Sequence, residues 1–202
     1  MYKIAAFIKF NKKIENKILY QKKKVKDLFG DQTYLNHPVH LTLFTLKIKK
    51  ISELKIFYKK LESKKKTKSL TISLSSADIF INDPLTGGHT IFYKIKKNKV
   101  LNSIQINHLR KINKKIKVLK DDLYLFKDLT LKKNYKDYGF PFVDKIWLPH
   151  ITIASIKNIK PQHKFIRDFL KTKISLKCII DEIRFYKIIK DKHTFLFKTE
   201  II

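Results

Sequence analysis

The sequence predicts an α+β fold built from two related halves, and three observations lead to this prediction. The expected elements follow the order strand, helix, strand, helix, two strands, then helix, strand, helix, two strands. The same tetrad occurs once in each half, as His40-Leu41-Thr42-Leu43 and His150-Ile151-Thr152-Ile153. Only 4 glycines and 5 prolines are present, which leaves little room for flexible linkers. We therefore expect one bilobal, pseudo-two-fold domain over residues 1–202.

The first half is expected to begin with a strand and a long helix. Alternation and helical spacing predict a strand over 2–10 and a helix over 12–29, which Gly30 ends. A tetrad strand over 39–48 and a helix to residue 64, with Ser52 as its N-cap, should follow. The half closes with a hairpin of two strands on either side of the turn-rich segment 82–88; these strands span 69–80 and 90–96.

The second half is expected to repeat this order with a longer loop. Apolar spacing predicts a helix over 103–119, and the aromatic segment 135–149, broken by glycine and proline, predicts a loop. The second tetrad strand, at 151–156, precedes a helix over 161–172 with Pro161 in its first turn. Two long strands, 175–187 and 194–202, complete the chain.

The tetrads carry the chemistry. Side chains alternate along a strand, so His40, Thr42 and Phe44 are expected on one face, and His150 and Thr152 on one face of the other strand. A single copy is more typical of a half-buried strand histidine, but the matched pair favours a site for proton transfer and phosphate binding.

With these residues, the chain resembles the 2H phosphoesterase superfamily, whose signature is a pair of His-x-Thr/Ser-x tetrads, and within it the 2'-5' RNA ligase and 2',3'-cyclic phosphodiesterase branch. The resemblance implies two antiparallel sheets facing a central groove, with helices on their outer faces. It carries the catalytic roles onto His40, Thr42, His150 and Thr152, without a metal or cofactor. It also favours His40 as the acid and His150 as the base.

Further residues are candidates for binding the substrate. Some members of the ligase branch have an arginine where this chain has Ser155, whose hydroxyl brings a hydrogen bond but no charge. Tyr138, Phe142 and Trp147 precede the second tetrad, where they could stack on a base or, with Phe140, fill the gap between the lobes. Phe44 is a separate stacking candidate.

Charge and composition limit the kinds of substrate, metal ion and cellular location that we expect. The net charge of +29 favours an anionic substrate, although the near absence of arginine is also typical of an AT-rich genome. The other five histidines, among them His37 and His193, are interpreted as loop residues, with a position of His37 at the mouth of the groove as the alternative. No third ligand with convincing spacing supports zinc. The single cysteine, Cys178, and the lack of a long apolar run predict a cytoplasmic protein away from membranes, and we expect a monomer.

Three functions remain from the sequence. The favoured one is a metal-independent phosphoesterase for 2',3'-cyclic phosphate or 2'-5' bonds of RNA ends or small nucleotides, with reversible 2'-5' ligation as an additional activity. The second is a hydrolase of signalling oligonucleotides, either 2'-5' oligoadenylate or cyclic oligonucleotides. The third is a non-catalytic RNA-binding module, which would not need two proton-transfer groups.

Overall fold

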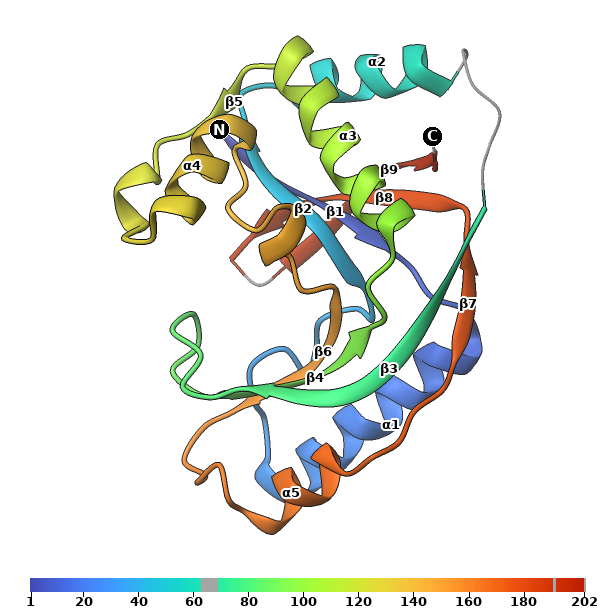
Figure 1. The fold of residues 1–202 in the computed structure, drawn as a ribbon, viewed down its shortest axis with the longest axis vertical. Helices are drawn as coiled ribbons and strands as arrows, with labels where there is room; N and C mark the ends of the chain where they lie inside the picture. The colour runs from blue at the N-terminus through green and yellow to red at the C-terminus, as the bar shows by residue number, and fades with distance from the viewer. Residues whose placement is uncertain (63–68, 191, 202) are drawn as a thin grey trace.

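The computed structural model describes residues 1–62, 69–190 and 192–201. It contains two antiparallel sheets with helices around them, which confirms the predicted α+β class (Figure 1). The first sheet has the strand order β5-β2-β1-β8-β9, and the second has the order β6-β4-β3-β7. The strands are β1 (Tyr2–Ile8), β2 (Leu41–Ile48), β3 (Leu70–Phe80), β4 (His89–Ile95), β5 (Val118–Leu119), β6 (His150–Ile156), β7 (Lys177–Ile180), β8 (Glu182–Ile189) and β9 (Lys192–Glu200).

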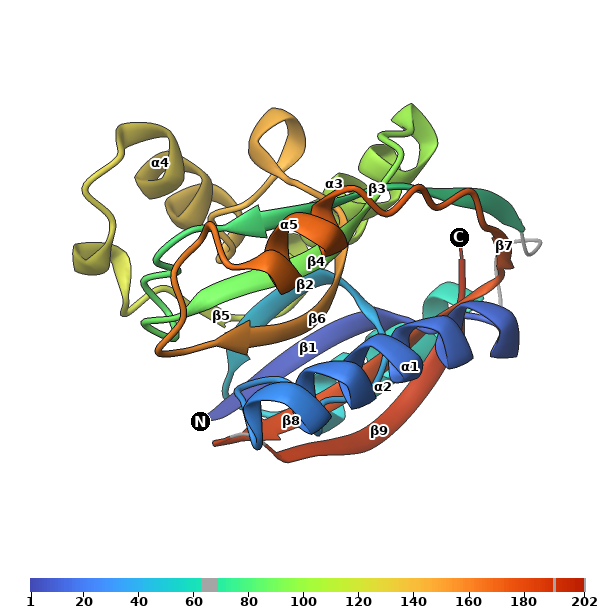
Figure 2. The ribbon, with the colours of Figure 1, turned by 90° about the horizontal axis from the view of Figure 1, so that it is seen from below.

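The two sheets have corresponding strand orders. In the first, the tetrad strand β2 pairs with β1, which pairs with β8 and then β9; in the second, β6 pairs with β4, then β3 and β7. Each sheet therefore supplies one tetrad strand, and β2 and β6 lie against each other where the sheets meet (Figures 1 and 2). This arrangement is the pseudo-two-fold, bilobal relation that the repeated element order predicts.

The helices α1 and α3 each pack on the sheet that carries one of the tetrads. Helix α1 (Lys12–Phe29) contacts β6, and helix α3 (Lys99–Lys115) contacts β2. Asn11 caps α1 by accepting a hydrogen bond from the Ile14 amide, and Gly30, with a φ of 70°, ends it where the sequence predicts. The shorter helices of the described ranges are α2 (Ile51–Glu62), α4 (Leu129–Tyr138) and α5 (Lys164–Leu170).

Several element boundaries differ from the sequence-based prediction. Ser52 lies inside α2 and does not cap it, and the predicted end of that helix at 64 lies outside the described residues. The segment expected to be a loop from 135 begins with the last turn of α4, which Gly139 ends in the left-handed conformation with a φ of 70°. A β-carbon at Gly139 would collide with Val118 Cγ1, so glycine also lets this segment pack on β5.

The C-terminal region departs most from the prediction. The expected strand 175–187 is two strands in different sheets, because β7 pairs with β3 while β8 pairs with β1. Only Asp181 separates them. Local alternation cannot reveal such a crossover, since alternate residues are buried in β7 and at the start of β8 and the choice of partner is non-local.

Both tetrad strands contain a bulge at the same position. In β2, Thr42 pairs with Phe7 and Phe44 pairs with the preceding residue, Ala6, so Leu43 is the extra residue. In β6, Thr152 pairs with Phe92 and Ala154 pairs with Ile91, so Ile153 is the extra residue. The bulged residue is thus the last member of each tetrad.

The bulge overturns one prediction. Neighbouring residues of β1 point to opposite faces, so Phe44, opposite Ala6, lies on the other face from Thr42, opposite Phe7. Phe44 is 1% exposed and its ring lies 6.3 Å from that of Phe185 in the core. The expectation that Phe44 shares the face of His40 and stacks on a base is wrong.

A single cluster of buried apolar side chains includes residues of both sheets, among them Leu41, Leu43, Ile151 and Ile153 of the tetrads. Their burial fixes which side of each tetrad strand faces away from the core. Among the described residues, no helix combines the length and the apolar character that crossing a membrane requires.

Candidate active site

The two tetrad histidines are held in the same way. His40 Nδ1 lies 2.6 Å from the carbonyl oxygen of Pro38, and His150 Nδ1 lies 2.7 Å from that of Leu148. A carbonyl can only accept, so each Nδ1 carries a proton and donates a hydrogen bond to the residue two positions earlier. Each Nε2 is therefore left to exchange a proton with another molecule.

A phenylalanine from the neighbouring strand supports each imidazole. Phe7, which pairs with Thr42, stacks on His40 with ring centroids 3.7 Å apart. Phe92, which pairs with Thr152, lies 4.9 Å from the His150 ring. Sequence reasoning missed both residues, because it requires the long-range register between strands to place them beside the tetrads.

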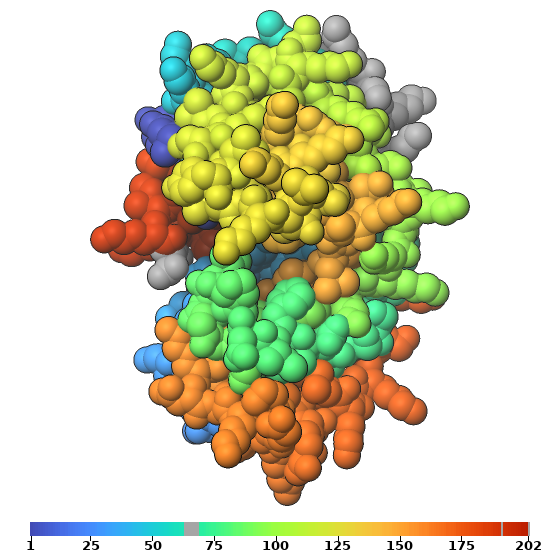
Figure 3. All heavy atoms as spheres, turned by 60° about the vertical axis from the view of Figure 1, so that its left-hand side comes forward, coloured from blue at the N-terminus to red at the C-terminus, as the bar shows by residue number. Residues whose placement is uncertain are grey.

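Within each tetrad, the histidine and threonine are more exposed than the apolar residues. His40, Thr42, His150 and Thr152 are half-buried, whereas the apolar tetrad positions are buried. Imidazole and hydroxyl therefore face out of each strand while the intervening residues anchor it in the core. Figure 3 shows a narrow hollow between the yellow region around α4 and the green β3–β4 hairpin.

Each tetrad strand is braced by the segment that leads to the other tetrad. The carbonyl of the bulged Leu43 accepts a hydrogen bond of 2.7 Å from Gln105 of α3, whose amide group also donates to the Phe142 carbonyl before the second tetrad. In return, the Ser155 amide donates to the Thr33 carbonyl in the loop before the first tetrad. The position of one tetrad is thereby coupled to that of the other.

The charges around the two histidines differ. Burial is the main cause that lowers the pKa of His40 to about 3; the bond to Pro38 opposes this shift, while the nearby His193, His37 and Lys22 add to it. Burial also lowers the pKa of His150, but the bond to Leu148 and the carboxylate of Asp83 oppose this effect. The neighbouring charges thus act in opposite directions: they oppose protonation of His40 and favour protonation of His150.

Asp83 owes its position to the β3–β4 loop. Its Oδ2 accepts a hydrogen bond of 2.6 Å from the Thr90 hydroxyl, and its Oδ1 accepts one of 3.0 Å from the Leu85 amide. The Asn-Asp-Pro sequence signals a turn, but not that its carboxylate lies near His150. Asp83 is thus another residue of the site that sequence reasoning missed.

Ser155 does not have the role expected of it. It is fully buried, and its Oγ lies 2.6 Å from the Thr86 hydroxyl, which ties the β3–β4 loop to β6. A substrate phosphate cannot reach a hydroxyl in that position. The prediction that Ser155 binds substrate is therefore wrong.

The aromatic candidates before the second tetrad divide into two kinds. Trp147 is 4% exposed and belongs to the core, so it packs between elements, as the alternative interpretation expects, and cannot stack on a base. Phe142 is 44% exposed, and Tyr138 is half-buried against the core. Phe142 and Tyr138 thus remain candidates for contact with a substrate.

Two further histidines approach the first tetrad. The His193 ring lies 6.0 Å from His40 and 4.5 Å from His37, and it also lies 5.5 Å from Phe7. The interpretation of His193 as a loop residue is wrong, because His193 lies in β9 and the β8–β9 hairpin carries it to the first tetrad, whereas His37 does lie in a loop. In the described part of the chain, no three or more His, Cys, Asp or Glu side chains are arranged to hold a metal ion.

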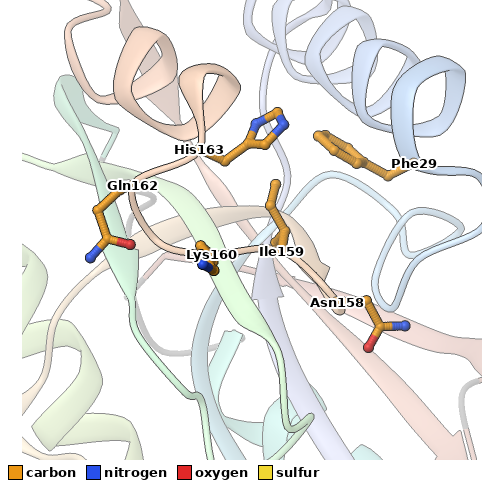
Figure 4. A pocket seen from close by; sticks show the side chains of 6 residues that line it. All are labelled: Phe29, Asn158, Ile159, Lys160, Gln162 and His163. Carbon is orange, nitrogen blue, oxygen red and sulfur yellow. The ribbon is translucent and has the colours of Figure 1, made fainter.

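Two surface hollows differ in their relation to the tetrads. One of about 160 Å³ is lined by His40, Phe7, Arg184 and Tyr186, among others. The other, of about 350 Å³, is lined by none of the tetrad residues; Figure 4 shows Phe29 and His163 among its lining side chains, and their rings are 5.6 Å apart. Of these two, only the smaller hollow belongs to the candidate active site.

Comparisons with known proteins agree with this architecture. No family model and no curated protein matches the sequence. Solved structures do match: TT0787 of Thermus thermophilus has 16% identity and a TM-score of 0.66 over 98% of this chain and 97% of its own. A structure described as a phosphoesterase has 12% identity and a TM-score of 0.58 over 99% and 98%. Escherichia coli LigT in complex with 3'-AMP has 12% identity and a TM-score of 0.57 over 99% and 97%.

These similarities extend over nearly the whole of each chain, so the fold of this protein is the one that those structures share. The predicted α+β fold with two antiparallel sheets is thereby confirmed.

Proposed function

We propose that the protein is a metal-independent phosphoesterase that acts on 2',3'-cyclic phosphate or 2'-5' phosphodiester bonds of RNA ends or small nucleotides. The observation that carries this proposal is the match between the two tetrads, each with a bulge at its last residue and a histidine tethered through Nδ1. A binding module has no need of two imidazoles prepared in the same tautomer. An acid and base pair does need them.

The charges favour a division of roles. His40, which burial and the surrounding positive groups keep neutral, takes a proton from the attacking water through Nε2. His150, whose protonation Asp83 favours, donates a proton from Nε2 to the ribose oxygen that leaves phosphorus. This assignment is the reverse of the one that the family resemblance favours, and it rests on the electrostatics of the two sites.

The reaction balances without another reactant. For a 2',3'-cyclic phosphate, the water oxygen bonds to phosphorus and one ribose oxygen leaves, while one imidazole gains a proton and the other gives one up. The hydroxyls of Thr42 and Thr152 donate hydrogen bonds to the non-bridging oxygens, where negative charge increases in the transition state. The same sequence with a 5'-hydroxyl in place of water gives 2'-5' ligation: the 5'-oxygen bonds to phosphorus, and the 3'-oxygen of the cyclic phosphate leaves and takes up the proton.

The comparisons support this proposal at the level of fold and ligand class. One matching structure is described as a phosphoesterase, and LigT has been solved with 3'-AMP, a product-like nucleotide. The net charge of +29 also favours a phosphate-bearing substrate.

A substrate panel tests the proposal. The purified protein, treated with a chelator, is incubated with nucleoside 2',3'-cyclic phosphates, a 2'-5' linked dinucleotide, 2'-5' oligoadenylate and cyclic dinucleotides, and the products are separated by chromatography. We expect turnover of the 2',3'-cyclic phosphate or the 2'-5' dinucleotide. Turnover confined to the signalling oligonucleotides would favour that alternative, and RNA binding without turnover of any substrate would favour a non-catalytic module.

A further inference from the structure

Three histidines from two distant segments of the chain meet on one side of the candidate active site. His40 begins the first tetrad, His37 lies in the loop before it, and His193 lies in β9 at the end of the β8–β9 hairpin. We call this set the histidine corner. Its ring centroids are 4.5 Å apart for His37 and His193 and 6.0 Å apart for His40 and His193.

The corner also has a buried positive charge beneath it. Lys22 of α1 is 5% exposed, and its Nζ donates hydrogen bonds of 2.7, 3.2 and 2.7 Å to the carbonyls of Tyr34, Leu35 and His37. Burial lowers the pKa of Lys22 to about 8, and no acidic side chain of the described residues opposes this shift. A cation held by carbonyl groups fixes the loop that presents His37, and its charge is not neutralised locally.

Arg184 adds a guanidinium to the same hollow, since it lines the cavity that His40 lines. Its charge is partly balanced, because Glu182 accepts a hydrogen bond from Arg184 Nε. The carboxylate does not reach the histidine corner in any described contact. Lys9 and Glu15 also line this hollow, so Lys9 and Arg184 are opposed by the carboxylates of Glu15 and Glu182. The buried Lys22 leaves this side of the site positive.

The side of His150 has a different character. Its ring lies between Phe80, at 5.5 Å, and Phe92, at 4.9 Å, and the charged group that affects it is the carboxylate of Asp83. Lys94, which pairs with His150 across the strands, is bound to Asp78 at 2.6 Å. An anionic group is therefore stabilised on the His40 side and opposed on the His150 side.

We propose that His37 and His193 form a second phosphate subsite beside the reacting phosphate. The subsite would select nucleotides with a second phosphate, separated from the reacting phosphate by one nucleoside. This second phosphate is either a 5'-phosphate or the next internucleotide phosphate. The proposal rests on the proposed function for the position of the first phosphate. It also accounts for the weakly basic His40, because a second anion beside it would raise its pKa and strengthen it as a base.

Binding of product-like nucleotides tests the subsite without requiring turnover. The affinities of 3'-AMP, adenosine 3',5'-bisphosphate and the dinucleotide ApAp are measured by calorimetry at constant ionic strength. The proteins are the wild type, His37→Asn, His193→Asn, the double variant and His193→Lys. His163→Asn is the matched control, since His163 lies by the other hollow and caps α5.

We expect wild type to bind at least one ligand with the extra phosphate about tenfold more tightly than 3'-AMP. The double variant should lose this advantage, His193→Lys should retain it through charge, and His163→Asn should behave as wild type. If the bisphosphate binds more tightly than 3'-AMP, the second phosphate is a 5'-monoester. If ApAp binds more tightly, it is an internucleotide diester.

Other results overturn the inference. Equal affinity of wild type for all three ligands would show that the corner binds no second phosphate. An advantage that survives in the double variant would assign it to the surface lysines. A loss of the advantage in both His193→Asn and His193→Lys would indicate a structural role for His193. Because the assay measures binding, a failure of catalysis in the substrate panel would leave each of these results interpretable.

Discussion

The two tetrad strands are alike in geometry and unlike in charge. Each has a bulge at the last tetrad residue, a carbonyl two residues before the histidine that holds Nδ1, and a phenylalanine against the imidazole. Around His40 stand His37, His193 and Lys22, whereas Asp83 stands near His150. The shared geometry gives both histidines the same tautomer, and the different charges oppose protonation of His40 and favour protonation of His150.

The residues three positions before the histidines show the same contrast. His37 is half-buried beside His193, while Trp147 is packed in the core. A pseudo-symmetric backbone can therefore carry unequal side chains at equivalent places. We infer that the symmetry serves the chemistry common to both tetrads and the asymmetry serves their separate roles.

The largest effect is expected when either histidine of the His40–His150 pair is removed. His40→Ala or His150→Ala should each lower kcat by at least about 100-fold, the usual scale for losing a general acid or base. The double variant should be little worse than either single one, because the two act together. Circular dichroism should show that the fold is retained. Near-normal turnover by either single variant would contradict the two-histidine mechanism.

The hydroxyls should have equal but smaller effects. Thr42→Val and Thr152→Val keep the shape of the side chain and remove one hydrogen bond to a charged phosphate oxygen, which is worth about 1.5–3 kcal/mol. We expect kcat/KM to fall roughly 10- to 100-fold in each variant. A matched change at Thr45, which follows the bulge in β2, should have little effect. If only one of the two tetrad variants loses activity, the symmetric role of the hydroxyls is wrong.

A substitution of Asp83 tests the difference in charge between the surroundings of His40 and His150. Asp83→Asn removes the carboxylate that raises the pKa of His150, so His150 should lose its proton at a lower pH. The alkaline limb of the kcat/KM profile should therefore move to lower pH, and activity near neutral pH should fall severalfold. Asp27→Asn, at an exposed ion pair on α1, is the control. A shift of the acidic limb instead would reverse the assignment of acid and base.

Trp147 should have the smallest effect on chemistry. Trp147→Ala removes a core side chain and should destabilise the fold by about 3–5 kcal/mol, measured by urea unfolding, while kcat changes less than about threefold. Phe142→Ala, at an exposed position in the same segment, should leave stability nearly unchanged and weaken a dinucleotide by roughly 1–3 kcal/mol if its ring stacks on a base. The opposite pattern would return Trp147 to the binding site.

Local signals predicted the elements that depend on local forces. Helix α1 begins and ends where spacing and Gly30 place it, because its cap and its apolar face are encoded within the helix. The boundary between β7 and β8 was missed, since only their pairing with β3 and β1 distinguishes them. The repeated tetrads predicted two related strands, and the structure places one in each sheet.

The surroundings of the tetrads were predicted less well. Phe44 was assigned to the wrong face because strict alternation does not anticipate a bulge. Ser155 and Trp147 were given substrate contacts, although tertiary packing buries both. His193 reaches His40 through a hairpin near the other end of the chain, and no local pattern reports that approach.

The central claim is that the two tetrads form one acid and base pair that works without a metal. The most direct measurement is the pH dependence of kcat/KM for a 2',3'-cyclic phosphate after dialysis against a strong chelator. We predict full activity and a bell-shaped profile whose alkaline limb reports His150 below its ordinary pKa of about 6.5 and whose acidic limb reports His40 at still lower pH. A loss of activity that zinc or manganese restores, or a profile with no limb that responds to either histidine, would contradict the account.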